Sequence, residues 1–218
     1  YLYCNEVVCP ECGWRIPLAP SWVIGEKSHC VAKLRPNEEL RCYDILIEEG
    51  VSQEEMQEAK EAGTVRNSAL ICPHCDPNGN RSIPITMLRG DRRTGEGTQY
   101  GLRLWENEDI VPRPDDVFQE RLYCIRWVET YFDEDGNEVT ERYYLAPDEK
   151  DMQRERKVLE LLQERFYEWQ EKGYIPSRRI EPGYNTNQPI RERGWIYWHH
   201  LFNPRQLLVH LTTLESIN

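Results

Sequence analysis

The chain has 218 residues, of which 39% are hydrophobic, and its 27 basic and 38 acidic residues give a net charge of −11. This acidic surplus excludes a protein that wraps nucleic acid over its whole surface, so that any such contact must be local. No apolar run approaches the roughly 18 residues that cross a bilayer, and a mean hydropathy of −0.76 predicts a thin, subdivided core. The chain begins at Tyr1 without a signal-like segment, and we expect it to be a piece of a longer polypeptide.

Four of the eight cysteines form two Cys-x-x-Cys turns with the same spacing, CPEC and CPHC. Both turns precede loop residues: Gly13 follows the first, and Pro77 and Gly79 follow the second. A redox dithiol needs a helix behind it to lower its thiol pKa, which these residues disfavour. Four thiolates instead complete the tetrahedral shell of a structural zinc ion. The spacing predicts a closed zinc site at Cys9, Cys12, Cys72 and Cys75.

Alternatives to this ligand set remain open at the level of sequence. A dithiol oxidoreductase would use Cys72 and Cys75 alone. Either His29 or His74 lies beside a cysteine and could replace one ligand, although we expect both rings to be exposed. The other four cysteines are interpreted as buried thiols: Cys4, Cys30, Cys42 and Cys124.

The segments beside the two cysteine turns have the alternation of β-strands, which predicts a zinc ribbon. These segments are residues 1–9, 21–25 and 81–88. Between the halves of the ribbon we expect an insertion at about 31–66. It contains an extended run near residue 45 and a short helix that Ser52 and Glu55 begin with a capping box and that stops at Gly63.

The middle of the chain starts with a glycine- and arginine-rich stretch, which predicts a flexible connection or a loop that contacts anions. Gly95-Glu96-Gly97 within it is too weak a pattern for a phosphate loop. Two alternating runs joined by Asp135-Gly136 then predict a β-hairpin with a charged tip. A long amphipathic helix follows, with Asp148 as its N-cap, an end at Gly173 and one apolar stripe: Val158, Leu159, Leu162, Phe166 and Trp169.

The last forty residues combine an irregular arm with a helix. The arm has three prolines and four arginines, and an ordered arm of this length usually binds something. His199 and His200 lack companions at metal-ligand spacing and are expected in a turn. Asn203 as N-cap and Pro204 begin the final helix. We expect its apolar face to dock on a domain outside this chain: Leu207, Leu208, Leu211 and Leu214.

These elements predict an α+β fold in three regions. The first, residues 1–89, is the zinc ribbon with its helical insertion; the second, 90–175, holds the linker, the hairpin and the long helix; the third, 176–218, is the arm and the C-terminal helix. The chain has no serine nucleophile elbow, phosphate loop, HExxH motif or Pro-Pro dipeptide. We therefore expect no catalytic residues in this segment.

Taken together, the motifs in their order resemble one family, the adenine-specific DNA methylases of bacteria and archaea that carry a zinc ribbon inserted in the methyltransferase domain. The matching stretches are YLY before CPECG, IPLAPSW, GTV before CPHC, YYLAPDEKD, GYIPSRRIEPG and GWIYWHHLFNPRQLLVHLTTL. They span nearly the whole chain. The family has threonine where this chain has Asn203, and both residues cap helices.

This resemblance implies a cytoplasmic prokaryotic protein that acts in DNA methylation or restriction-modification. It implies a metal on the four cysteines, with DNA and the remainder of the methyltransferase polypeptide as partners and no membrane. In the family, S-adenosylmethionine and the Asp-Pro-Pro-Tyr motif belong outside this region, so the resemblance carries no activity over to this segment. A protein–protein interaction module remains the alternative function, and the net acidity favours it.

A methylase that flips adenine out of the duplex needs phosphate contacts nearby. The arginines that could supply them are Arg89, Arg92, Arg93, Arg178, Arg179, Arg191, Arg193 and Arg205, with Tyr184, Trp195 and Trp198 available for stacking. The competing interpretation pairs these arginines with the abundant acidic side chains.

Overall fold

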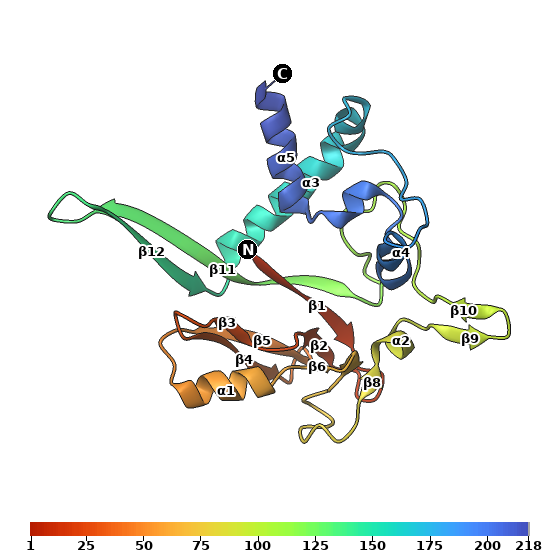
Figure 1. Cartoon of the computed structure of the whole chain (residues 1–218), viewed down its shortest axis with the longest axis horizontal. Coiled ribbons are helices and arrows are strands. Elements are labelled where there is room, and N and C mark those ends of the chain that lie inside the picture. The colour runs from red at the N-terminus through yellow and green to blue at the C-terminus, as the bar shows by residue number, and fades with distance from the viewer. Residues whose placement is uncertain (218) are drawn as a thin grey trace. The chain divides into compact units, whose positions relative to one another are not determined.

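The computed structural model describes residues 1–217 and has an α+β fold, with 28% helix and 30% strand in several antiparallel sheets (Figure 1). The chain forms two compact units. Unit 1 consists of Tyr1–Leu88 and Phe118–Pro147, and unit 2 consists of Arg89–Val117 and the chain from Asp148 onward. The hairpin therefore belongs to unit 1 and the long helix belongs to unit 2. The predicted middle region, residues 90–175, is divided between the two units.

Unit 1 is built around a four-stranded antiparallel sheet in the order β12-β11-β1-β2. These strands are β1 (Leu2–Val8), β2 (Arg15–Leu18), β11 (Gln119–Phe132) and β12 (Glu138–Leu145). The register pairs Leu2 with Cys124 and Asn5 with Leu18, so a strand from the middle of the chain completes the N-terminal sheet. The predicted hairpin is present, with its turn between Phe132 and Glu138.

Two smaller sheets complete unit 1. One has the order β3-β4-β5, from β3 (Val23–Gly25), β4 (Cys30–Asn37) and β5 (Cys42–Glu48). The other has the order β6-β7-β8, from β6 (Val65–Arg66), β7 (Ala69–Leu70) and β8 (Ile83–Pro84). The strand predicted over residues 81–88 is wrong beyond Pro84, because the chain turns there into the short helix α2 (Ile85–Leu88).

The predicted insertion helix is α1 (Gln53–Glu61). The Ser52 side chain accepts a hydrogen bond from the backbone N–H of Glu55, and the backbone N–H of Ser52 donates one to the Glu55 carboxylate, which confirms the capping box. The helix packs Ala59 into the core of unit 1, beside Trp22, Val31 and Ile45. Burial of this face against β3 and β4 fixes a helix that would be marginal in isolation at nine residues.

Unit 2 centres on two helices, α3 (Glu149–Glu171) and α5 (Pro204–Ile217), which pack against each other. Asp148 caps α3 as predicted, by accepting from the backbone N–H of Asp151. Asn203 caps α5 through a 2.9 Å hydrogen bond from the backbone N–H of Gln206 to its Oδ1. The unit also contains the hairpin β9 (Arg92–Thr94) and β10 (Gly97–Gln99), the helix α4 (Asn187–Arg193) and the 3₁₀ turn η1 (Trp198–Leu201).

The core of unit 2 corrects one prediction about α5. Leu207 and Leu211 are buried, and they pack against Leu162, Phe166 and Trp169, the buried part of the predicted α3 stripe. The apolar face of α5 is therefore covered within this chain, and the expectation of docking on an outside domain is wrong for these two residues. Figure 1 shows the two helices crossing beside each other.

Two further expectations need correction. The arm is only partly irregular, because α4 lies within it and Arg179 forms a bridge with Tyr197. His199 and His200 lie in the 3₁₀ turn before α5, as predicted, and both are buried. The glycine- and arginine-rich stretch forms the β9–β10 hairpin rather than a connection without structure. No helix in the described residues is both long and apolar enough to cross a membrane.

Candidate metal centre

The sulfur atoms of Cys9, Cys12, Cys72 and Cys75 all lie within 4.8 Å of one another. The Sγ–Sγ distance is 3.8 Å for Cys9 and Cys75 and 3.7 Å for Cys12 and Cys72. Zinc–sulfur bonds of about 2.3 Å in a tetrahedron place ligand sulfurs about 3.8 Å apart. The two turns, separated by some sixty residues, therefore meet at the spacing that a four-thiolate zinc site requires.

The first cysteine turn is held by backbone hydrogen bonds. Gly13 N donates to the carbonyl oxygen of Cys9 over 2.8 Å, and Cys9 N donates to that of Trp14 over 2.8 Å. Gly13 has φ +72°, a left-handed conformation that a residue with a Cβ adopts at a cost. Arg41 adds a bond from outside the turn, from its guanidinium to the carbonyl oxygen of Cys12. These contacts hold the turn that carries Cys9 and Cys12.

The second cysteine turn continues into a further turn, not a helix. Asp76 N donates to the carbonyl oxygen of Cys72 over 3.0 Å, and Gly79 N donates to that of Asp76 over 3.0 Å. The helix that a redox dithiol needs behind Cys75 is therefore replaced by a loop. Because two cysteines from the other turn also reach the site, a dithiol pair acting alone does not describe the geometry.

Burial and hydrogen bonding shift the pKa values of the cysteine thiols in different directions. Burial raises the pKa of Cys9, but hydrogen bonds from the backbone N–H groups of Cys12 and Glu11, together with those from the side chains of Cys12 and Cys72, bring that pKa below its ordinary value. Burial raises the pKa of Cys72 to about 11, and burial followed by hydrogen bonding with Cys72 raises that of Cys75. A metal ion would replace these protons, because zinc binds thiolates.

Trp14 and His74 join the two turns from outside the ligand set. Their rings are stacked, with centroids 4.0 Å apart and planes inclined by 18°. Trp14 also contacts the ring of Tyr43, whose pKa burial raises to about 12. His74 is exposed, as predicted, and takes no place among the four sulfurs. The sequence indicates this role of Trp14 only through its position directly after Gly13.

The remaining cysteines lie apart from this site. Cys4, Cys30 and Cys124 are buried and free, and burial raises their pKa values to about 12, 12 and 11, respectively. Cys42 is half-buried, and burial raises its pKa as well. His29 is half-buried rather than exposed, with its Nδ1 3.0 Å from the carbonyl oxygen of Val51.

A second metal site at Cys30, Cys42 and His29 is excluded by strand register. Val31 pairs with Glu48, whereas Asn37 pairs with Cys42, so Cys30 and Cys42 lie at opposite ends of the β4–β5 ladder. At about 3.3 Å per residue this places them some 20 Å apart. Within residues 1–217, the four-sulfur cluster is the one group of metal-ligating side chains that converges.

The arginines named as DNA-contact candidates all belong to unit 2. Three of them pair with carboxylates: Arg89 with Asp91, Arg178 with Glu181 and Arg205 with Glu155. Three others lie over aromatic rings: Arg179 over Tyr197, Arg191 over Tyr100 and Arg193 over Trp195. Arg92 and Arg93 are exposed on β9, and of the aromatic neighbours Tyr184 and Trp198 are exposed while Trp195 is half-buried.

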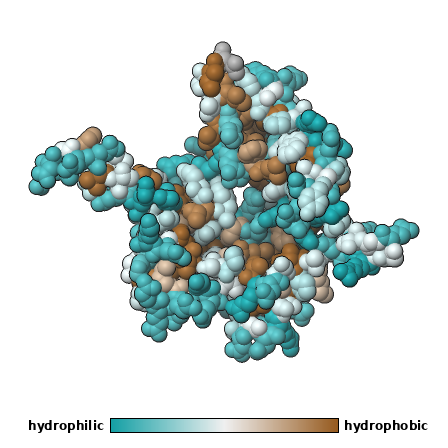
Figure 2. Space-filling view, in the orientation of Figure 1, coloured by the Kyte–Doolittle hydropathy of each residue, from teal (hydrophilic) through white to brown (hydrophobic). Residues whose placement is uncertain are grey.

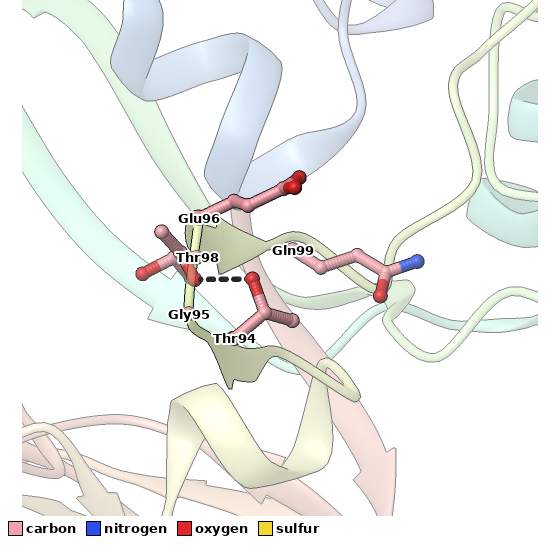
Figure 3. A pocket seen from close by; sticks show the side chains of 6 residues that line it. Thr94, Gly95, Glu96, Thr98 and Gln99 are labelled. Carbon is pink, nitrogen blue, oxygen red and sulfur yellow. Dashed lines mark hydrogen bonds between the residues drawn. The ribbon is translucent and has the colours of Figure 1, made fainter.

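The Gly95-Glu96-Gly97 turn connects β9 to β10 and is closed by its own hydrogen bond, from Thr94 Oγ1 to the carbonyl oxygen of Gly97 over 3.0 Å (Figure 3). The hollow at this turn is lined by residues 94–99 alone. The Glu96 carboxylate extends outward from the turn, and its negative charge opposes an anion at this position. The turn therefore lacks the converging donors of a phosphate-binding loop.

Comparison of the chain with protein-family models, curated proteins and solved structures finds no match. The sulfur cluster therefore stands on its own geometry. The four cysteines could bind a metal ion, and four cysteine ligands are consistent with zinc.

Proposed function

We propose that this chain is a zinc-binding accessory region of a larger, S-adenosylmethionine-dependent adenine-specific DNA methyltransferase. The observation that carries the proposal is the convergence of the four cysteine sulfurs at zinc-ligand spacing. Four thiolates fill a tetrahedral shell and leave no position for water or substrate, which makes the role of the metal structural. The methyltransferase assignment rests on the motif resemblance.

Within unit 1 the metal would connect segments that short-range structure cannot connect. Residues 9–12 follow β1, and residues 72–75 follow β7, so one ion would join the central sheet to the β6-β7-β8 sheet. Binding energy at such a site contributes directly to folding. Cys9, Cys12, Cys72 and Cys75 would hold the ion, and the Trp14–His74 stack would support it from outside.

Contact with DNA, in this proposal, belongs to unit 2. Unit 1 carries 11 basic and 20 acidic residues, a net of −9, whereas unit 2 carries 16 and 18, a net of −2. The smaller negative charge of unit 2 and the exposed Arg92 and Arg93 favour it for phosphate contact. Arginines held over aromatic rings, as at Tyr100 and Tyr197, also offer flat surfaces for unpaired bases.

The metal is tested by elemental analysis of the purified chain and of Cys72→Ser. We expect about one zinc per wild-type chain, lost together with the unit 1 fold in the variant. Cys42→Ser is the matched control, because Cys42 is half-buried in unit 1 but outside the sulfur cluster. A metal-free wild-type chain with a reversible Cys72–Cys75 disulfide would overturn the proposal in favour of a dithiol oxidoreductase.

The DNA role is tested by binding of a fluorescent duplex to the chain and to Arg92→Glu/Arg93→Glu. The charge-matched control is Arg156→Glu/Lys157→Glu on α3. We expect binding that weakens with salt and is lost in the first variant only, since phosphate contacts release counterions. Adenine methylation by the parent methyltransferase, measured with this region present and with it deleted, gives the effect of the region on the reaction.

A protein–protein interaction module is the second candidate function. It is favoured by the ion pairs that already neutralise Arg89, Arg178 and Arg205. In that case the wild-type chain would not bind duplex DNA. The parent methyltransferase would bind DNA no more tightly than a parent that lacks this region, while the zinc content of the chain would stay the same.

A further inference from the structure

The outer half of the β11–β12 ribbon consists of two strands alone. β1 pairs with β11 only over residues 119–124, while β12 pairs with β11 from Ile125 to Phe132. From residue 126 to the turn every side chain of β11 is exposed, and those of β12 are exposed or half-buried. Figure 1 shows this part of the ribbon extending beyond β1 and β2. A two-stranded ribbon is marginally stable in water, so a ribbon of this length and exposure calls for a functional explanation.

One face of the ribbon is aromatic. The register places Trp127 opposite Tyr143, Glu129 opposite Glu141, and Tyr131 opposite Val139. Because alternate residues of a strand share a face, these three pairs lie in succession on one side. We call these six residues the aromatic face. Trp127 is 37% exposed and Tyr131 is 40% exposed.

The middle pair of the aromatic face is unfavourable in the free protein. Glu129 and Glu141 are like charges in directly opposite positions, an arrangement that destabilises a sheet. Tyr131 donates a 2.8 Å hydrogen bond to Glu141, and this bond raises the pKa of Tyr131. Among the residues that the structure describes, neither carboxylate takes part in an ion pair. A cation placed between the flanking rings would relieve the repulsion and gain a cation–π contact.

The outer edge of β12 is open for pairing from Glu138 to Arg142. β12 is the terminal strand of its sheet, and Tyr144 N donates to Glu49 Oε1 over 2.9 Å rather than into the β11 ladder. Backbone N–H groups of alternate residues point the same way, so those of Arg142, Thr140 and Glu138 face the open edge. Unpaired edge groups of this kind accept an added strand.

The net charge of the ribbon indicates which class of partner it can bind. Residues 126–145 contain two arginines and six acidic residues, a net of −4. Figure 2 shows the projecting end mainly in hydrophilic colour. This charge opposes nucleic-acid phosphate, an anionic lipid surface and a second copy of this acidic chain. It favours a basic polypeptide.

We propose that the ribbon binds an extended, lysine- or arginine-bearing segment of another protein. The segment adds along the open edge of β12 as a further strand of the sheet, and its cationic side chains lie over Glu129 and Glu141 between the rings of the aromatic face. Main-chain hydrogen bonds give affinity, and the paired carboxylates select for positive charge. This contact is independent of the methyltransferase assignment and of the arginines of unit 2.

The test uses the whole zinc-loaded chain and a fluorescent ten-residue peptide of alternating lysine and threonine. A peptide with glutamate in place of lysine and a short DNA duplex serve as competing probes. Glu129→Gln/Glu141→Gln removes the paired charges, and Glu54→Gln/Glu58→Gln removes the same charge from α1 as a control. Thr140→Pro removes one edge N–H that does not point into the β11 ladder.

We expect the lysine peptide to bind at low salt, and removal of the paired charges to weaken it about five- to tenfold. Thr140→Pro should weaken it about three- to tenfold through the lost edge hydrogen bond. The α1 control should bind within about twofold of wild type, because its charges act only at long range.

Three results would overturn the proposal. The first is absence of lysine-peptide binding at low salt, and the second is equal affinity for the Glu129→Gln/Glu141→Gln chain. The third is preference of the same surface for duplex DNA, detected as DNA binding that the Glu129→Gln/Glu141→Gln change alters and Arg92→Glu/Arg93→Glu does not. Circular dichroism of each variant establishes that the ribbon is still folded.

Discussion

The indole ring of Trp14 stacks on the imidazole ring of His74, with ring centroids 4.0 Å apart. Trp14 is 2% exposed and follows the first cysteine turn, whereas His74 lies inside the second. The contact therefore links the two halves of the sulfur cluster without supplying a ligand. Removing each ring separately distinguishes support of the metal centre from coordination.

His74→Ala should retain about one zinc per chain and lose about 1 kcal/mol of unfolding free energy, the usual value of an aromatic pair. Trp14→Ala should cost about 3–5 kcal/mol, because it also empties a buried site. Its zinc should then be lost to a chelator faster than in the wild-type chain. Elemental analysis and urea unfolding measure both effects, and loss of zinc from His74→Ala would make His74 a ligand.

The packing of α5 on α3 gives a prediction for unit 2. Leu211 is fully buried against the core of that unit, whereas Val209, on the same helix, is 62% exposed. Leu211→Ala should lower the free energy of unfolding by about 2–5 kcal/mol through lost contact and a residual cavity. Val209→Ala should change it by less than about 0.5 kcal/mol. Similar values for the two would mean that α5 is not docked on α3 in solution.

The cap of α5 provides a second, local test. Asn203 Oδ1 accepts from the backbone N–H of Gln206, a donor that the first turn of a helix otherwise leaves unpaired. Asn203→Ala should therefore cost about 1 kcal/mol, while Asn203→Thr should stay within a few tenths, because threonine also caps. Thermal unfolding of the three proteins checks this order. Equal losses for alanine and threonine would contradict the capping role.

His200 makes the stability of unit 2 depend on pH. Its Nδ1 lies 3.3 Å from the backbone nitrogens of Ile196 and Tyr197, which donate to it, so this nitrogen carries no proton. Burial first, and then His199, lower the pKa of His200 to about 4; Arg103 acts in the same direction, whereas Asp109 and the Glu106 carbonyl oppose it. In the unfolded chain a histidine titrates near pH 6.5.

Because the folded pKa is depressed, this contribution to stability is complete above about pH 6.5. It is lost as the pH falls toward 4, by an amount on the order of 3 kcal/mol. His200→Asn keeps an acceptor near Nδ1 but does not titrate, so its loss of stability between pH 7 and pH 5 should be smaller than that of the wild type. His210→Asn, at an exposed position, is the control, and proton competition at the cysteines affects all three proteins alike.

Much of the local structure follows from residues close together in sequence. Ser52, Asp148 and Asn203 cap their helices as their side chains predict, since a cap needs only the next three residues. The hairpin around Asp135-Gly136 follows from a turn flanked by alternating strands. The two cysteine turns likewise need only their own spacing and the glycine or proline after each.

Partners distant in sequence required the tertiary structure. An apolar stripe predicts that one face of a helix is buried, but it does not identify the element that covers this face. The sequence of α5 therefore did not indicate that α3 covers Leu207 and Leu211. His199 and His200 are buried because carbonyl groups of Pro176, Asn107 and Glu106 converge on them.

The charged surface shows the same division between sequence and structure. The composition determines that the chain is acidic, whereas the fold determines which charged side chains lie next to each other. Strand register places Glu129 opposite Glu141, and helix packing brings Arg205 into contact with Glu155. Likewise, the spacing of the cysteines in the sequence predicted that four of them form one group that could bind a metal. Only the tertiary structure could bring Cys12 within 3.7 Å of Cys72, because the intervening chain must first fold into its strands and α1.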